Sequence, residues 1–338
     1  QRDFIITNEP VDGGAVDMRS ANGNIMVSNG SVINIAGDDT GSDAGKLDLE
    51  VMNGLLTFNG DLLASAADSF ISGEVDVTAQ SISSLSEFNQ KLNNAGAFNK
   101  RHIEVIAGDI VLGDNDLVKS SDIALIASQG SVILNSGSAV DASGMQGGTI
   151  RLVALDNIEL NNGAVIDASA DGASDNRGGN MRLEVASPDS EINLREGSQI
   201  NLLGGNGNPN GEVYARLQAD TASSQTGQLA DRVTWAAQGL TEASQATLVA
   251  YDKDELTAAD SLNQTYIQEN FDSISSFLDL TSPELLAEIN SSNFEILPGI
   301  QVEANQLAET TGEINLANLR YDASPGEFTL RSSSALNI

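Results

Sequence analysis

Two aspartates in equivalent surroundings are the strongest candidates for chemistry in this chain. Asp141 and Asp167 each end a short apolar segment and precede the residues Ala-Ser. On neighbouring parallel strands their carboxylates would lie roughly 5 Å apart, which suits a retaining glycosidase or a calcium ion, with Arg151 and Arg182 stacked on the adjoining strand. Aspartate in such a turn also caps its own backbone, however, and Asn201 takes the third equivalent position. We therefore interpret both aspartates as turn residues and predict no catalytic residue.

The other candidate groups are one histidine and one acidic loop. His102 is the only histidine, and it has no serine or cysteine partner at a recognisable nucleophile elbow, so we interpret it as a surface residue. Asp38, Asp39 and Asp43 offer the oxygen ligands that calcium prefers, but their loop lacks the spacing of an EF-hand. They are weak calcium candidates, and we predict no other cofactor.

Three stretches that repeat one pattern must position these groups. Residues 123–144, 150–172 and 181–204 each contain a short alternating apolar strand, a turn, a second strand, a corner centred on glycine and a third strand. One such unit cannot bury its own apolar face, so the units must stack. The pattern predicts an all-β fold, a right-handed parallel β-helix (β-solenoid) with a small α-helical insertion.

The register of the stack can be predicted from the apolar positions. Ile158 and Ile166 should point into the column and stack on Ile192 and Ile200. The equivalent first-strand positions are expected to be Ile25, Leu47, Val75, Ile103, Ile123, Ile150, Met181 and Val213.

Two segments break the strand pattern. Apolar residues recur at helical spacing near residues 80–100, which predicts a short helix that leaves and rejoins the stack. Residues 251–295 form an acidic segment with ten acids and one base, and we expect it to be an α-helical insertion between coils 1–250 and coils 296–338. Ser282 and Pro283 suggest the start of a second helix there. We expect this insertion to pack a stripe on the shaft as a removable appendage; the stripe comprises Leu262, Tyr266, Ile274 and Leu278.

Composition excludes several classes of function. The 338 residues carry 48 acids and 16 bases, a net charge of −32, so nucleic acids and anionic membrane surfaces should be repelled. There is no cysteine, which removes disulfides, thiol catalysis and zinc thiolate sites. No run of about 18 apolar residues occurs, so we predict no membrane span.

Three segments of the chain carry recognisable motifs: GGTIRLVALDNIELNNGAVIDASADG at 147–172, GGNMRLEVAS at 178–187, and residues 297–338, where Pro-Gly precedes a strand and a second Pro-Gly phrase ends in Thr-Leu-Arg. These segments resemble the repeats of the filamentous-haemagglutinin-like exoproteins of bacterial two-partner secretion systems. The N-terminal secretion domain of that family is not evident. Residues 208–211 (Asn-Pro-Asn-Gly) match one of its short motifs by letters, but such a cluster is what any tight turn uses.

The resemblance implies a long adhesin at the bacterial cell surface or outside the cell. Its partners would be an outer-membrane β-barrel transporter during export, and afterwards a ligand on a host or neighbouring cell, or other copies of itself. Because the sequence begins at Gln1 and stops within an alternating segment, we expect an internal fragment of a longer protein. Two other interpretations stay open: a carbohydrate-active β-helix enzyme, and a subunit of a self-assembling extracellular filament.

Overall fold

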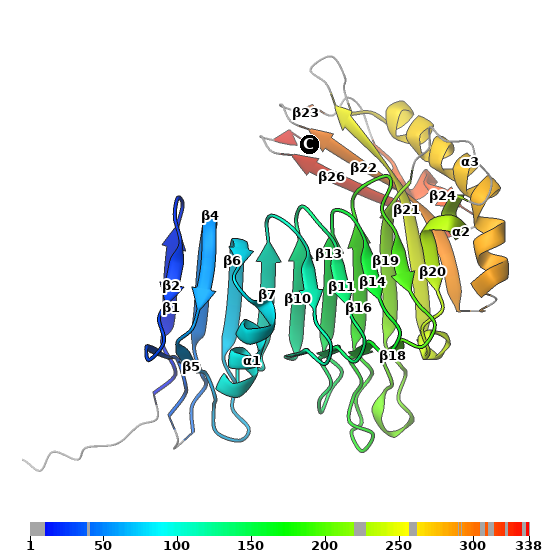
Figure 1. Cartoon of the computed structure of the whole chain (residues 1–338). Coiled ribbons are helices and arrows are strands. Elements are labelled where there is room, and N and C mark those ends of the chain that lie inside the picture. The colour runs from blue at the N-terminus through cyan, green and yellow to red at the C-terminus, as the bar shows by residue number, and fades with distance from the viewer. Residues whose placement is uncertain are drawn as a thin grey trace, which may run out of the picture.

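The chain is mostly β, with long parallel sheets and few helices, an arrangement consistent with an all-β parallel solenoid. The structure is a computed structural model that describes residues 11–38, 41–219, 228–256, 262–289, 291, 293–304, 308–309, 314–321, 324–332 and 336–337. Its strands run side by side along one axis, from β1 at one end of the stack to β21 near the other (Figure 1).

The largest sheet contains twelve strands, and all of its strand pairs are parallel. In chain order these strands are β1 (Ala15–Ser20), β2 (Ile25–Val27), β4 (Lys46–Phe58), β6 (Glu74–Ile82), β7 (Lys100–Val105), β10 (Asp122–Ala127), β13 (Thr149–Ala154), β16 (Asn180–Val185), β19 (Glu212–Gln218), β21 (Gln245–Leu256), β22 (Phe294–Ala304) and β26 (Glu327–Ser332). We call it the main sheet.

Two shorter sheets, both parallel, accompany the main sheet. The first contains β8 (Ile110–Leu112), β11 (Val132–Leu134), β14 (Ile158–Leu160), β17 (Ile192–Leu194) and β20 (Val233–Trp235). The second contains β9 (Leu117–Lys119), β12 (Ala139–Asp141), β15 (Val165–Asp167) and β18 (Gln199–Asn201). Ile158 pairs with Ile192 and Ile166 with Ile200, so the register predicted for these coils is confirmed.

Three small strand pairs and three 3₁₀ turns of the described chain lie outside these sheets. They comprise the parallel pair β3 (Val32–Asn34) and β5 (Asp61–Leu63), the parallel pair β23 (Ala308–Glu309) and β27 (Leu336–Asn337), the antiparallel pair β24 (Arg320–Tyr321) and β25 (Ser324–Pro325), and the 3₁₀ turns η1 (Gly205–Gly207), η2 (Leu240–Glu242) and η3 (Leu316–Asn318). The segment at 208–211 lies in the connection from β18 to β19, as its turn composition predicts.

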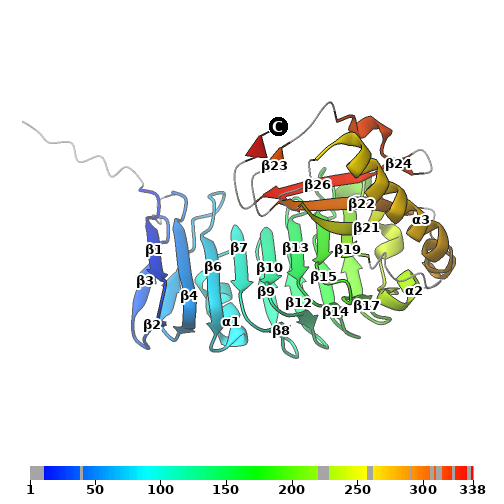
Figure 2. The ribbon, with the colours of Figure 1, turned by 90° about the horizontal axis from the view of Figure 1, so that it is seen from above.

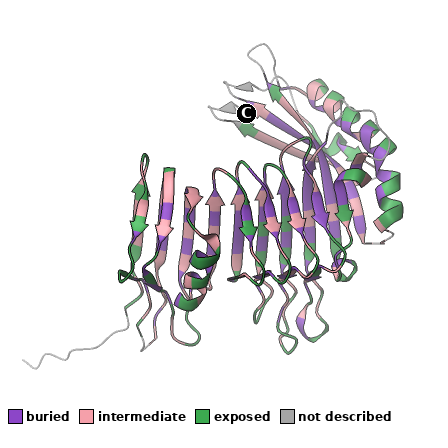
Figure 3. Ribbon diagram, viewed as in Figure 1, coloured by how far each residue is buried: buried purple, intermediate pink, exposed green. Residues whose placement is uncertain are grey.

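The core is a column of aliphatic side chains enclosed by the three sheets. Buried residues alternate with half-buried or exposed ones along the strands of the main sheet (Figure 3). Glycine permits the close packing of the corners: a Cβ atom on Gly179 would lie 2.0 Å from the carbonyl oxygen of Gly148 in the preceding coil. The glycine pairs of the repeat are therefore positions where successive backbones touch, and no side chain fits there.

The predicted register is wrong at β7. Val75 and Ile123 both pair with Arg101, whereas Ile103 lies two residues further along and pairs with Val77 and Leu125. Arg101 therefore occupies the column and is fully buried. At the N-terminal end the prediction also fails, since Leu47 pairs with Val16 of β1 and not with Ile25.

Helix α1 (Leu85–Ala95) explains how an arginine fits into the column. The guanidinium of Arg101 donates to Asn93 Oδ1 at 2.8 Å and to the carbonyl of Ala97, just beyond the C-terminus of this helix, at 3.2 Å. The negative end of the helix dipole favours a cation at that place. Desolvation still lowers the pKa of Arg101 to about 9.

The helix predicted near residues 80–100 is confirmed as α1, which begins after the cap residue Ser84. It contacts β5 on one side and β8 and β9 on the other, so it occupies the space of two strands in that coil while the main sheet continues past it.

The acidic segment differs from its prediction. Strand β21 runs to Leu256 because Asp252–Leu256 pairs with Ile300–Ala304 of β22, so the boundary expected at residue 250 falls inside a strand. Helix α3 (Gln264–Ile289) follows as one helix, and Pro283 lies within it. No second helix begins at Ser282; instead the Ser282 hydroxyl donates back to the carbonyl of Leu278 at 2.7 Å.

Helix α3 covers the C-terminal end of the stack, together with the short helix α2 (Gln228–Arg232) (Figures 1 and 2). Its side chains Ile274, Phe277, Leu278 and Leu285 belong to the same buried cluster as the column. Leu262 packs in a second, smaller cluster with β22. The expected stripe is therefore partly confirmed. However, α3 closes the end of the core, whereas the sequence suggested a removable appendage.

The last strands bend back over the main sheet. Figure 2 shows β22 and β26 above the strands β13 to β19. We call residues 299–304 of β22 together with β26 the C-terminal layer. Contacts between this layer and the outward face of β16 and β19 cover side chains that a simple stack would leave in solvent.

Candidate functional site

The two aspartates singled out in the sequence do lie in register on neighbouring strands. Asp141 pairs with Asp167, and Asp167 pairs with Asn201. Each carboxylate accepts two hydrogen bonds from the serine two residues on, from its backbone N–H at 2.9 Å and from its hydroxyl at 2.6 Å. This is the geometry of a self-capped turn.

The partners of this pair favour a structural role. Lys119 Nζ lies 3.2 Å from Asp141, and Asn201 donates to Asp167 at 3.2 Å. Burial tends to raise the pKa of Asp141, but the hydrogen bonds from Ser143 and the charge of Lys119 outweigh it, and the pKa lies below its ordinary value. An ionised, doubly capped carboxylate is a poor proton donor.

Arg151 and Arg182 do not serve these aspartates, which corrects the grouping proposed from the sequence. They pair with each other across β13 and β16 and point outward from the main sheet. Their nearest carboxylate is Glu184, at 3.8 Å from Arg151 and 3.7 Å from Arg182. The aspartates belong to a different sheet, so the two groups face different sides of the molecule.

A buried ion cluster surrounds Glu184, and sequence analysis missed it. The side chain of Glu184 is 5% exposed, and Arg331 of β26 donates to it at 3.0 Å. Arg216 lies 3.4 Å from the same oxygen, donates to Gln301 at 2.7 Å and lies 2.8 Å from Glu327. Four of the eleven arginines thus gather around one carboxylate in a chain of charge −32.

Electrostatics keeps this cluster ionised. Burial tends to raise the pKa of Glu184, but Arg216, Arg182 and Arg331 outweigh it, so the pKa lies below the ordinary glutamate value. Arg216 also stacks 3.8 Å from the ring centre of Tyr251, and Tyr214 donates to Glu327. Burial raises the pKa of Tyr251 to about 12. Glu184, Arg216, Glu327 and Arg331 bind one another, and these charged contacts fasten the C-terminal layer to β16 and β19.

His102 lies at the surface, where its side chain is 34% exposed. Its ring lies between two carboxylates of neighbouring strands, with Nε2 at 3.2 Å from Asp122 and Nδ1 at 3.6 Å from Asp76. Asp76 also pairs with Lys46 at 2.7 Å and Lys100 at 2.8 Å. His102 therefore belongs to a row of polar and charged side chains on the outer face of the main sheet.

In the acidic loop proposed for calcium, the carboxylate of Asp43 binds the backbone. Asp43 accepts a hydrogen bond from the backbone N–H of Ile71 at 2.8 Å, and the backbone N–H of Asp38 donates to Ser42. Asp39 lies outside the described residues. Within the described part of the chain, no group of three or more acidic or histidine side chains is arranged to hold a metal ion, and calcium binding stays a prediction.

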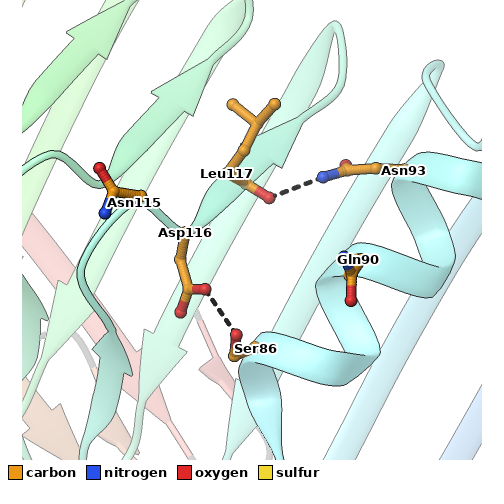
Figure 4. Close-up of a pocket in the computed structure, with 6 residues that line it drawn as sticks. All are labelled: Ser86, Gln90, Asn93, Asn115, Asp116 and Leu117. Carbon is orange, nitrogen blue, oxygen red and sulfur yellow. Dashed lines mark hydrogen bonds between the residues drawn. The ribbon is translucent and has the colours of Figure 1, made fainter.

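A polar hollow of about 210 Å³ lies between α1 and the start of β9 (Figure 4). Ser86 donates to Asp116, and Asn93 donates to the carbonyl of Leu117 at 2.8 Å. These hydrogen bonds join the two walls of the hollow and so hold α1 against the edge of β9.

Comparisons with protein-family profiles, with curated proteins and with solved structures give no match. Among the described helices, none is long and apolar enough to cross a membrane.

Proposed function

We propose that this chain is a shaft segment of an exported, surface-displayed adhesin of the filamentous-haemagglutinin type, folded as a right-handed parallel β-helix. The observation that carries the proposal is the repeated parallel register. From β10 to β19 the main-sheet strands pair residue for residue. Over the same part of the chain, the strands of the two shorter sheets also pair in parallel without a shift in register. A stack of this kind can lengthen by adding coils, which suits an extended structure outside the cell.

Charge and side-chain chemistry support a structural role over an enzymatic one. The net charge of −32 favours a hydrated surface that resists aggregation. The aspartate pair that could have served a glycosidase is used by its own turns. Export through an outer-membrane barrel and attachment to a surface ligand are what the family resemblance adds to this proposal.

Surface labelling tests the proposal. Antibody raised against the chain should label intact cells that express the parent protein, and proteinase added outside those cells should remove the label. Beads coated with the purified chain should also attach to a surface that uncoated beads do not bind. Label that appears only after the cells are permeabilised would refute the exported shaft.

A further inference from the structure

We propose that the outer face of the main sheet carries a binding site for a short acidic oligosaccharide, with its carboxylate on Arg151 and Arg182. This inference adds a ligand class to the proposed adhesive role, and its biological significance rests on that proposed function. The site itself is argued from the geometry of β13, β16 and β19.

The two arginines form an exposed cationic pair. They are register partners on adjacent parallel strands, so their backbones lie about 4.8 Å apart, and like charges placed this way repel. Their side chains are 44% and 48% exposed. Glu184 lies beyond hydrogen-bonding distance of both, and no described residue accepts a hydrogen bond from either guanidinium. Arg182 also lies over the ring of Tyr214, 4.9 Å from its centre, a contact that leaves its N–H donors without an acceptor among the described residues.

Positive charge exceeds negative charge at this place. Arg216 and Arg331 contact the same Glu184 as the exposed pair, and Arg216 also lies 2.8 Å from Glu327, so four guanidiniums lie near two carboxylates. The outward neighbours of Arg151 and Arg182 on the same rung of the sheet are Ala124 and Tyr214, which carry no charge at neutral pH. A planar carboxylate matches the donor fork of arginine.

A polar hollow adjoins the pair. It has a volume of about 370 Å³, and its lining includes Gln146, Asn176, Asn180 and the backbone at Gly147 and Gly178. Its two charged lining residues, Arg177 and Glu212, lie 3.5 Å apart as an ion pair. Its volume falls within the range of small-molecule sites.

The hollow and the arginine pair lie on the same face of one strand. Asn180 precedes Arg182 by two residues on β16, so the two side chains share a face about 7 Å apart. Asn180 accepts from the backbone N–H of Glu212 at 3.3 Å and Asn176 donates to the carbonyl of Met145 at 3.0 Å, so the remaining side of each amide is what a sugar hydroxyl would meet. A disaccharide could thus place hydroxyls in the hollow and its carboxylate on the arginines.

The charge of the whole chain limits the length of this ligand. A surface of net charge −32 repels a long polyanion, whereas the local excess of positive charge attracts one or two carboxylates. We therefore assign the site to a short uronic-acid oligosaccharide and not to a long acidic polymer.

Calorimetry at low ionic strength tests the site. The probes are digalacturonate and its dimethyl ester, which has the same shape without the charges. The acid should bind at least tenfold more tightly than the ester. In the double variant Arg151→Gln/Arg182→Gln the affinity for the acid should fall at least tenfold. Arg195→Gln is the matched control, because Arg195 is 51% exposed, pairs with Glu159 at 3.0 Å and directly follows β17, a strand of another sheet. The affinity of this variant should stay within twofold of the parent.

Thermal melting of each variant shows whether the fold is kept. No binding of digalacturonate by the folded parent, equal binding of acid and ester, or an unchanged affinity in the folded double variant would each overturn the site. If the coated beads still attach to their surface but the sugar does not bind, the sugar site is overturned and the proposed adhesive function is not.

Discussion

The two ends of the stack are built differently. At the C-terminal end, α3 places Ile274 and Leu278 in the core, and both are fully buried. At the other end, Val16 and Met18 of β1 are only partly buried, and no described strand pairs with the outer edge of β1. Large apolar side chains are also exposed in the first coils; they include Met26, Val32, Leu63, Phe70 and Ile71.

The difference shows what a coil needs in order to be stable. A coil in the middle has a neighbour on each side, whereas an end coil needs either a cap or another coil. The C-terminal end has a helix and a folded-back layer as its cap, so its stability should depend on a few side chains. The first coils should open more readily, and substitutions there should cost less.

The largest expected effect comes from placing a charge under the cap. Leu278→Asp buries an unpaired carboxylate and should lower the free energy of unfolding by about 3 kcal/mol or more, while Met18→Asp should cost less than about 1 kcal/mol. Denaturant titration with circular dichroism measures both. Trp235, which lies 5.1 Å from Phe294, reports the C-terminal end by fluorescence. An equal loss in the two variants would remove the contrast between the ends.

A second comparison uses one carboxylate from each half. Glu184→Gln leaves Arg216 buried with one fewer counter-charge and should cost about 2 to 4 kcal/mol. Glu50→Gln, whose side chain is 37% exposed and lies 3.6 Å from Arg19, should stay within about 0.5 kcal/mol of the parent. Hydrogen exchange should place the loss in β26. Unchanged protection of β26 in Glu184→Gln would show that the ion cluster does not fasten the layer.

Acid should weaken the C-terminal layer through Glu184. Its pKa is lower in the folded than in the unfolded chain, so the ion cluster contributes fully above the ordinary glutamate value of 4.5. That contribution is lost as the pH falls through the lowered pKa. Exchange in β26, corrected for intrinsic rates, should rise on acidification below that value in the parent and change less in Glu184→Gln. Equal pH profiles would exclude Glu184 as the titrating group.

The smallest effect is expected in the middle coils. Asp167→Asn should change stability by less than about 0.5 kcal/mol, because Asn201 already fills the equivalent turn and accepts from the backbone of Leu203. Neither parent nor variant should release reducing or unsaturated ends from pectate or alginate, with or without calcium. Release by the parent that Asp167→Asn abolishes would restore the enzyme interpretation.

Sequence periodicity predicted the middle coils well because their register depends on aliphatic residues alone. From Ile123 to Val213 the predicted column positions are the observed ones. The apolar pattern failed at Arg101, because a search for apolar residues passes over an arginine. The burial of Arg101 depends on hydrogen bonds at the C-terminus of α1. The pattern also failed at residues 252–256, where the strand exists only because β22 pairs with it.

The candidate site was less predictable than the fold. The turn role of Asp141 and Asp167 followed from local sequence, and the structure confirms it. The ion cluster depends on β26 folding back, which brings Arg331 to Glu184 from 147 residues away. The signal present in the sequence was the unusual density of arginine around residues 151–216 in an acidic chain. Spacing along the chain alone does not show which face those side chains share.

The folded-back layer also determines how the molecule should respond to force. Backbone hydrogen bonds between stacked strands lie along the axis of the stack, so a pull on its end would ordinarily peel one strand at a time. Arg331 and Glu184, however, join β26 directly to β16, with β19, β21 and β22 between them in the sheet order. Tension applied beyond β26 therefore meets this cross-link first, and the C-terminal strands should resist as a block and then release together.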